Sequence, residues 1–266
     1  MMFAKSSLYA IGLALGLSAI MPSQAEAHRR WLLPSATVLA GETETVSVDA
    51  AASNGLFLFD HRAMPLDSLV VIGPDGQAVA PEIIGSGAYR SVFDLALKQQ
   101  GTYRLALVSD GMMGVYELNG ERRRFRGSPE NLPEGATNVR TSQTSSRTET
   151  FVTLGAPSPV EPTNKGLEMI ALSHPNDIVA GEPAQMRFLI DGEPASGIEV
   201  EFVEGGTRYR DDAGIRMLTT DADGIVSLEA ANAGMYYVEA SVTREAADGQ
   251  PDRRSSYTAV LEFLPL

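Results

Sequence analysis

The sequence predicts an all-β protein made of two antiparallel β-sandwich domains of immunoglobulin-like size, joined by a proline-rich linker and preceded by a cleaved signal peptide. Short apolar runs alternate with polar residues at the period of strands, and turns containing glycine, proline or aspartate separate these runs. No strong amphipathic helix follows residue 27. The absence of a continuous strand–helix alternation argues against a doubly wound nucleotide-binding fold.

Residues 1–27 read as a secretory signal peptide. Lys5 supplies the positive charge, residues 8–20 are mostly apolar, and Ala25 and Ala27 form an A-x-A cleavage site. The apolar run is too short to span a membrane comfortably, and no later stretch approaches about 18 apolar residues. We therefore expect an exported, periplasmic protein that begins at His28 and does not insert into the membrane.

Composition excludes several classes of function. The net charge is −13, so the chain would repel the phosphates of nucleic acid. It contains no cysteine, which excludes disulfides, thiolate metal sites and cysteine nucleophiles. There is no G-x-S-x-G elbow, phosphate loop or dinucleotide fingerprint. We expect that the protein is not an enzyme; a copper oxidase is a third, weaker hypothesis.

The N-terminal sandwich is expected to cover residues 28–154. Asn119-Gly120 is a strong signal for a two-residue hairpin, and Pro74-Asp75-Gly76 predicts another turn. The segment 127–140 looks looser because it is rich in strand-breaking residues. The strands predicted from alternation are residues 43–48, 68–72, 88–97, 102–108, 113–118, 121–126 and 148–154.

Residues 155–166 contain three prolines and little to bury, so we interpret them as a semi-rigid linker. Strand character then resumes, and residues 167–266 are expected to form the second sandwich. Asp191-Gly192 and Asp223-Gly224 are its clearest turns. Its predicted strands are residues 167–172, 184–190, 198–203, 225–230, 235–242 and 257–263.

His28 is the first candidate for chemistry. Once cleavage frees its α-amine, an N-terminal histidine can bind a metal ion with both its amine and its imidazole. A second imidazole from elsewhere would complete a three-nitrogen site, often called a histidine brace. Copper(II) or nickel(II) suits such donors. The alternative is that His28 only marks the point where the peptidase cuts.

Only two other histidines are present, and none forms an H-x-x-x-H pair. His61 is the preferred partner of His28, with Asp60 and Met64 nearby as weaker candidate ligands. The alternative for His61 is a surface histidine paired with Asp60. His174 precedes a proline and a turn, which favours a structural role over that of an interdomain metal ligand.

The segment Glu121-Arg122-Arg123-Arg124-Phe125-Arg126 is the one basic cluster in this acidic chain. Alternate side chains of a strand point to the same face, so Arg122, Arg124 and Arg126 could together contact a carboxylate or an anionic metal chelate. The alternative is a solvated edge strand whose charge protects it from aggregation.

Several segments resemble the bacterial family called domain of unknown function 4198, and the resemblance covers essentially the whole mature chain. The segments are residues 28–35 (HRRWLLPS), 59–62 (FDHR), 147–151 (RTETF), 166–169 (GLEM) with 173–177 (SHPND), and 205–211 (GGTRYRD). The family's His-x-x-Trp-Leu-x-Pro start falls on His28, Trp31, Leu32 and Pro34. The chain departs from many relatives in Arg29 and Arg30, whose positive charges oppose a cation at His28.

This resemblance implies a periplasmic component of nickel and cobalt uptake, related to accessory proteins encoded near TonB-dependent receptors and membrane reductases. It supplies no catalytic residues. Our hypothesis is that the protein binds one transition-metal ion (nickel, cobalt, copper or iron) or a metal chelate in support of uptake. The alternative is a non-catalytic interaction module that docks on a membrane transporter or TonB-dependent receptor without binding metal.

Overall fold

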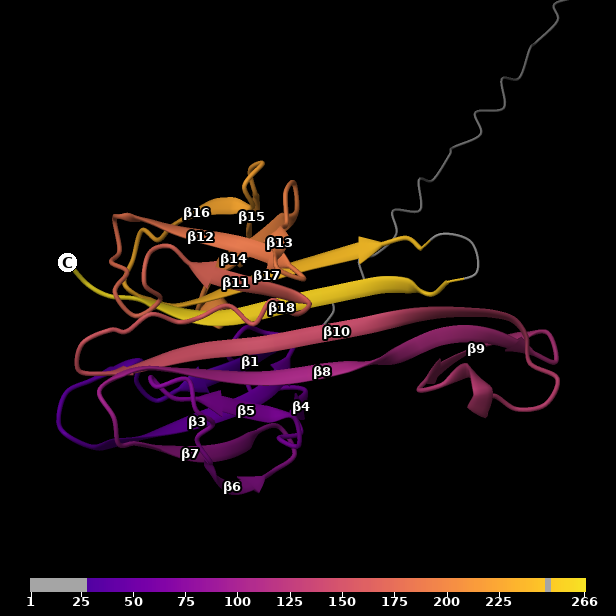
Figure 1. The fold of residues 1–266 in the computed structure, drawn as a ribbon, viewed down its shortest axis with the longest axis horizontal. Coiled ribbons are helices and arrows are strands. Elements are labelled where there is room, and N and C mark those ends of the chain that lie inside the picture. Colours follow the sequence, from indigo (N-terminus) through magenta and orange to yellow (C-terminus); the bar gives the residue numbers. More distant parts are fainter. Residues whose placement is uncertain (1–27, 247–249) are drawn as a thin grey trace, which may run out of the picture.

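A computed structural model describes residues 28–246 and 250–266, so the predicted signal peptide of residues 1–27 lies outside the described residues. Within these residues eighteen strands form three sheets, and Figure 1 shows their arrangement. In the part that is described, the only helical elements are two 3-10 turns, η1 (Pro129–Asn131) and η2 (Thr207–Tyr209). No helix there is long and apolar enough to cross a membrane. The predicted all-β class is confirmed.

Two small sheets lie on either side of a larger one, which we call the central sheet. The first small sheet contains β1 (Arg29–Pro34), β3 (Glu44–Ser53), β7 (Ser91–Leu97) and β6 (Glu82–Ser86), with β4 (Arg62–Ala63) paired to β3. The other small sheet contains β11 (Leu167–Ala171), β12 (Pro183–Ile190), β13 (Glu193–Pro194) and β16 (Ile225–Glu229).

The central sheet has nine strands. Its order is β15 (Arg216–Thr219), β14 (Glu199–Glu204), β17 (Gly234–Arg244), β18 (Asp252–Phe263), β10 (Thr137–Leu154), β8 (Gly101–Leu118) and β5 (Leu69–Ile72). β2 (Val38–Leu39) pairs with β10, and β9 (Glu121–Arg126) pairs with β8. In Figure 1, β8, β9 and β10 extend well beyond the two small sheets.

The central sheet runs through both halves of the chain. β10 from the N-terminal half pairs in parallel with β18 from the C-terminal half, from Ser142↔Asp252 to Thr150↔Val260 (Figure 1). The predicted linker, residues 155–166, contains no strand. Both predicted sandwiches therefore use one continuous sheet, and the division into separate domains at residues 154 and 167 stays a prediction.

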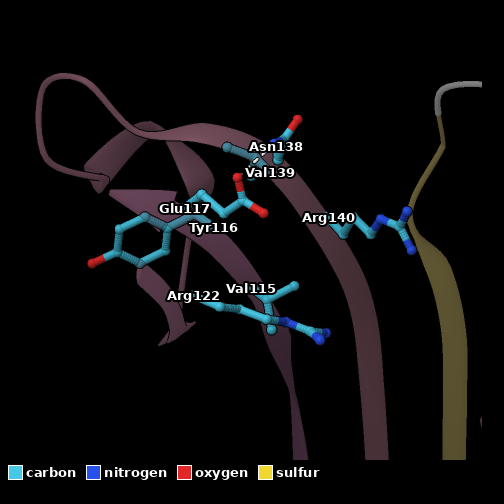
Figure 2. A pocket seen from close by; sticks show the side chains of 7 residues that line it. All are labelled: Val115, Tyr116, Glu117, Arg122, Asn138, Val139 and Arg140. Atoms are coloured by element: carbon cyan, nitrogen blue, oxygen red, sulfur yellow. Dashed lines mark hydrogen bonds between the residues drawn. The ribbon is translucent and has the colours of Figure 1, made fainter. Parts of the chain in front are cut away.

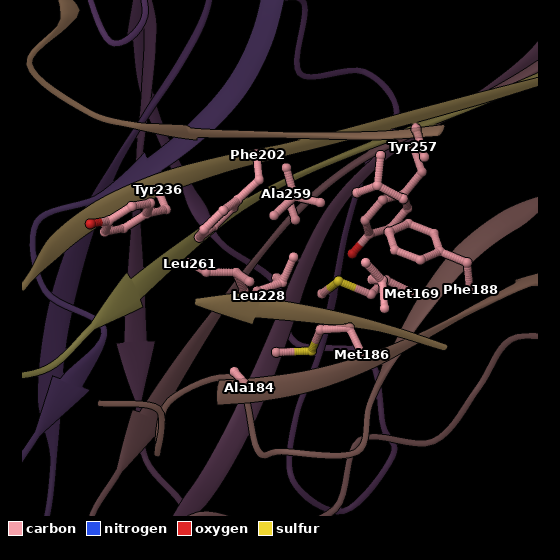
Figure 3. Packing of buried hydrophobic residues seen from close by; sticks show 14 of the residues in the cluster. Met169, Ala184, Met186, Phe188, Phe202, Leu228, Tyr236, Tyr257, Ala259 and Leu261 are labelled. Carbon is pink, nitrogen blue, oxygen red and sulfur yellow. The ribbon is translucent and has the colours of Figure 1, made fainter. Parts of the chain in front are cut away.

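Alternation along β10 places a core on each face of the central sheet. Val152 and Leu154 pack in the core with the first small sheet, whereas Phe151 faces the core of the other one. Figure 3 shows Met169, Met186 and Phe188 of that second core. Trp31 of β1 centres a third cluster, which joins the first small sheet to Val203, Tyr237 and Val260 of the central sheet.

Two long strands differ from the sequence prediction. β8 is continuous where we expected breaks between residues 102–108 and 113–118, and β10 begins at Thr137, inside the segment expected to be loose. The reason is the long β8–β10 ladder, which carries the exposed residues Ser109, Asp110 and Gly111 as strand despite their low strand propensity. The Asn119-Gly120 hairpin is confirmed, with φ of 55° and 80° at these two residues.

A buried network of charges lies where the central sheet meets the predicted linker. Glu149 is fully buried, and its Oε1 accepts hydrogen bonds from Arg104 at 2.8 Å and Arg147 at 2.9 Å. Its Oε2 accepts from the hydroxyl of Tyr257 at 2.8 Å. Burial and then the negative charge of Glu149 raise the pKa of Tyr257 well above its ordinary value, so this hydroxyl stays a donor.

The same network holds the proline-rich segment in place. Glu168, also fully buried, accepts from the backbone amides of Thr163 at 2.8 Å and Asn164 at 2.6 Å. Arg104 donates to the carbonyl of Glu161 at 3.0 Å and lies 3.4 Å from Glu168. Residues 161–164 are thus fixed by hydrogen bonds to buried charges, although they form no strand.

Candidate functional site

The ends of two strands bring His28 and His61 together. β1 and β4 pair with opposite edges of β3, and both run antiparallel to it. Arg29 lies opposite Ser53, and Arg62 lies opposite Ala52. Both strands therefore begin at the same end of β3, and the residue before each one is a histidine.

The two imidazole rings are stacked. Their centroids are 3.5 Å apart and their planes are inclined by 7°. His28 is exposed and His61 is half-buried. Desolvation lowers the pKa of His61, and the charges of His28 and Arg62 lower it further, while Asp60 opposes the shift. The neutral imidazole is the form that binds a metal, so this environment favours ligation by His61.

The stacked pair is close enough for one ion. Two nitrogens bound to a common ion at about 2 Å lie within about 4 Å of each other. The lone pairs lie in the ring planes, so parallel rings do not point at a common centre, and one ring must turn about its side-chain bonds to share an ion. No group of three His, Asp or Glu residues suited to a metal occurs within residues 28–246 and 250–266. The third ligand would have to come from another donor, and the α-amine of His28 would be one if the chain is cleaved before that residue, as the sequence predicts.

The other predicted ligands are engaged elsewhere. The carboxylate of Asp60 accepts hydrogen bonds from the backbone amides of Asn54 at 2.8 Å and Gly55 at 3.0 Å, which fixes the loop before His61. An ion pair between Asp60 and His61 is absent from the described part of the chain. Met64 is buried in the core of the first small sheet. Asp60 and Met64 are thus both held by contacts other than the histidine pair.

His174 lies away from this pair and is hydrogen-bonded through both ring nitrogens. Its Nε2 lies 3.0 Å from Oγ1 of Thr102 and 3.0 Å from the carbonyl of Ser158, and its Nδ1 accepts from the amide of Asn176 at 3.2 Å. These contacts join β8, the predicted linker and the loop after β11. The geometry is that of a structural histidine.

Arg29 and Arg30, the two cations next to His28, dock on the central sheet. Arg29 forms an ion pair with Glu201 at 2.8 Å, and Arg30 donates to the hydroxyls of Ser146 and Ser256. The charge of Arg29 is therefore compensated by a partner 172 residues further along the chain. Because this partner is so distant in the sequence, no local pattern predicts it. The ion pair reduces the electrostatic repulsion that Arg29 would exert on a cation at His28.

The basic cluster lines a concave surface where β8, β9 and β10 extend beyond the small sheets. Arg122, Arg124 and Arg126 line a groove of about 800 Å³, together with Arg140 of β10 and Arg254 of β18. We call these five side chains the arginine face. Figure 2 shows Arg122 and Arg140 beside Val115, with Arg140 reaching toward β18, while Tyr116 points away from them. Sequence reasoning missed Arg140 and Arg254, because only strand pairing brings them near β9.

Comparison with known proteins gives a family and weak structural similarity. Residues 25–244 match the family described as "Domain of unknown function (DUF4198)". No curated protein matches the chain. Solved structures similar to it include the "D0-D1 domain of Intimin", with 13% identity, a TM-score of 0.22, and coverage of 88% of this chain and 97% of that one.

Two further solved structures are similar at the same level. The "D00-D0 domain of Intimin" has 12% identity and a TM-score of 0.20, and the match covers 89% of this chain and 100% of that one. "Escherichia coli alpha-2-macroglobulin activated by porcine elastase" has 11% identity and a TM-score of 0.21, with coverage of 88% of this chain and 31% of that one. Similarity this weak supports no inference about function.

Proposed function

We propose a metal-binding function for this chain, which belongs to the DUF4198 family. After removal of residues 1–27, the protein binds one transition-metal ion through the α-amine and imidazole of His28 and the imidazole of His61. The observation that carries this proposal is the 3.5 Å separation of the two rings at the shared end of β3. The chain contains only three histidines, and two of them meet across a distance of 33 residues in sequence.

The donor set indicates the class of metal. One amine and two imidazoles suit copper(II) or nickel(II), and cobalt and iron remain candidates because imidazole also binds them. Three protein ligands leave positions for water or for a transferred ligand, as a protein that hands on its ion requires. We propose that the protein acts in the periplasm, where it captures or delivers a metal ion in support of uptake without transforming a substrate.

A second candidate is an interaction module that docks on a membrane transporter or TonB-dependent receptor without binding metal. The observation that favours it is β6, at the edge of the first small sheet, where Ile83 and Ile84 are more than half exposed. An exposed apolar edge strand is a template for pairing with another chain. In this case the histidine pair would have no ligand.

Replacement of His61 by alanine tests the metal site. We expect His61→Ala to weaken metal affinity by at least about 10- to 100-fold, because loss of a direct ligand should cost no less than loss of an outer-shell partner. His174→Ala is the matched control and should leave the affinity unchanged, since both nitrogens of His174 are engaged away from the pair. Isothermal titration calorimetry with copper(II) and nickel(II) on protein starting at His28 gives both values.

Unchanged affinity after His61→Ala would remove His61 from the site. A native protein that contains no metal after purification, does not bind copper or nickel, and co-purifies with a membrane partner would favour the interaction module instead.

Metal affinity should also depend on pH. Protonated nitrogens cannot bind a metal, so affinity should fall as the pH drops through the imidazole range. Because the pKa of His61 is lowered from 6.5, its contribution should persist to slightly more acidic pH than that of an ordinary histidine. Titrations between pH 5 and pH 8, using His61→Ala as the reference, isolate this contribution. An affinity that does not change over this range would contradict imidazole ligation.

A further inference from the structure

The arginine face is built by strand register. In the β8–β9 pair Val115 lies opposite Arg124, and in the β8–β10 pair Val115 lies opposite Arg140. Residues directly opposite each other point to the same face of a sheet. Val115 therefore lies between two guanidinium side chains that reach it from different strands.

The same strand register places the other three arginines on this face of the sheet. Arg122 and Arg126 lie two residues either side of Arg124 on β9, so they share its face. Arg254 of β18 lies opposite Thr144 of β10, which is four residues from Arg140 and so has the same orientation. All five line one groove of about 800 Å³.

The charge of this surface opposes that of the protein. The chain has a net charge of −13, yet among the described residues the acidic side chains that line the groove or the pocket beside it are Asp252 and Glu117. Within the described residues none of the five forms an ion pair. Arg123, on the opposite face of β9, is paired with Glu121 at 3.0 Å. The arginine face therefore has an excess of positive charge that nothing described neutralises.

We propose that the arginine face binds a small anion that carries two or more carboxylate or phosphate groups. The groove volume falls in the range of small-molecule sites, about 300–1,000 Å³. Arginines two residues apart on β9 are separated by about 6.6 Å, and β9 and β10 are about 9.6 Å apart across β8. A ligand with several charged groups can contact the arginines of both β9 and β10 at once, whereas a single oxyanion can contact the arginines of only one of these strands.

The floor of the groove suits an anion with an organic skeleton. Met113 and Val115 line it between the arginines. Arg forks bind carboxylate and phosphate oxygens by paired hydrogen bonds, and an apolar floor between them supports a carbon backbone. This binding does not depend on the histidine pair, so the proposal is separate from the metal function.

The test uses citrate and pyrophosphate as probes, with acetate as a singly charged reference, in calorimetric titrations of protein starting at His28. Citrate, pyrophosphate or both should bind, and acetate should bind far more weakly. Arg124→Gln and Arg140→Gln should each weaken polyanion binding about 10-fold or more, the loss expected for a charge-assisted hydrogen bond. Arg123→Gln makes the same charge change on the opposite face and should leave the affinity unchanged.

Three results would overturn the proposal. One is the absence of citrate and pyrophosphate binding to the native protein, and another is an equal loss in Arg123→Gln and Arg124→Gln. The third is binding to anionic phospholipid vesicles without binding of either probe. His61→Ala should leave anion affinity unchanged, so failure of the metal site and failure of the arginine face are distinguishable. These arginines are surface residues, and circular dichroism verifies that the variants are folded.

Discussion

Glu149→Gln should lower the free energy of unfolding by about 3–5 kcal/mol, the usual cost of removing one partner from a buried ion pair. The Glu149 carboxylate is fully buried and accepts hydrogen bonds from Arg104, Arg147 and Tyr257. Glutamine keeps the shape of the side chain but removes the charge. Arg104 would then keep its ion pair with Glu168 at 3.4 Å, whereas Arg147 would keep no ion pair within the described residues.

Urea denaturation of protein starting at His28 measures this loss. Glu121→Gln is the matched control, because Glu121 also forms an ion pair with an arginine, Arg123, but is 72% exposed. An exposed pair contributes about 0–1 kcal/mol, so this variant should be nearly as stable as the native protein. Equal effects of the two substitutions would show that the buried network contributes no more than a surface ion pair.

Retaining residues 24–27 ahead of His28 should weaken metal binding by at least about 100-fold, since loss of a direct ligand exceeds the about 10- to 100-fold cost of losing an outer-shell partner. In this longer protein the nitrogen of His28 belongs to an amide, so it no longer offers a free amine. The imidazoles of His28 and His61 remain, but two nitrogens without the chelating amine hold an ion less tightly.

Copper(II) and nickel(II) titrations of proteins that begin at His28 and at Gln24 measure this difference. Acetylation of the α-amine of the His28 protein is a second form of the same change and should have the same effect. Citrate or pyrophosphate binding at the arginine face should not differ between the two proteins. Equal metal affinity in both would show that the amine is not a ligand.

Local signals in the sequence identified the turns and the histidine pair, but long-range pairing decided the rest. Asn119-Gly120 carries its own backbone preference, so its hairpin could be predicted. Because the chain has only three histidines, the sequence could single out His28 and His61 as candidate ligands. Their proximity arises because β1 and β4 flank β3, and the sequence did not reveal that pairing. Such pairing depends on which strands come together in the fold, and it produces no periodic pattern in the sequence.

The arginine face, too, could be predicted from local sequence signals only in part. Alternation within β9 indicated that Arg122, Arg124 and Arg126 would share a face, because the period of a strand is two. Arg140 and Arg254 belong to other strands, and their place in the groove follows from pairing of β8, β10 and β18. The sequence alone therefore could not predict that Arg140 and Arg254 belong to this site.

The parallel pairing of β10 with β18 affects the order in which the protein can fold. β18 is the last strand of the structure and lies inside the central sheet, between β17 and β10. Its contacts with β10 join residues 110 apart, as in the hydrogen bond between Thr150 and Val260. Contacts so distant in sequence form late and slow folding. Until residues 252–263 have been synthesised, the edge of β10 between Ser142 and Thr150 stays unpaired. During that interval the nascent chain presents an open strand edge that a chaperone could protect or another chain could join.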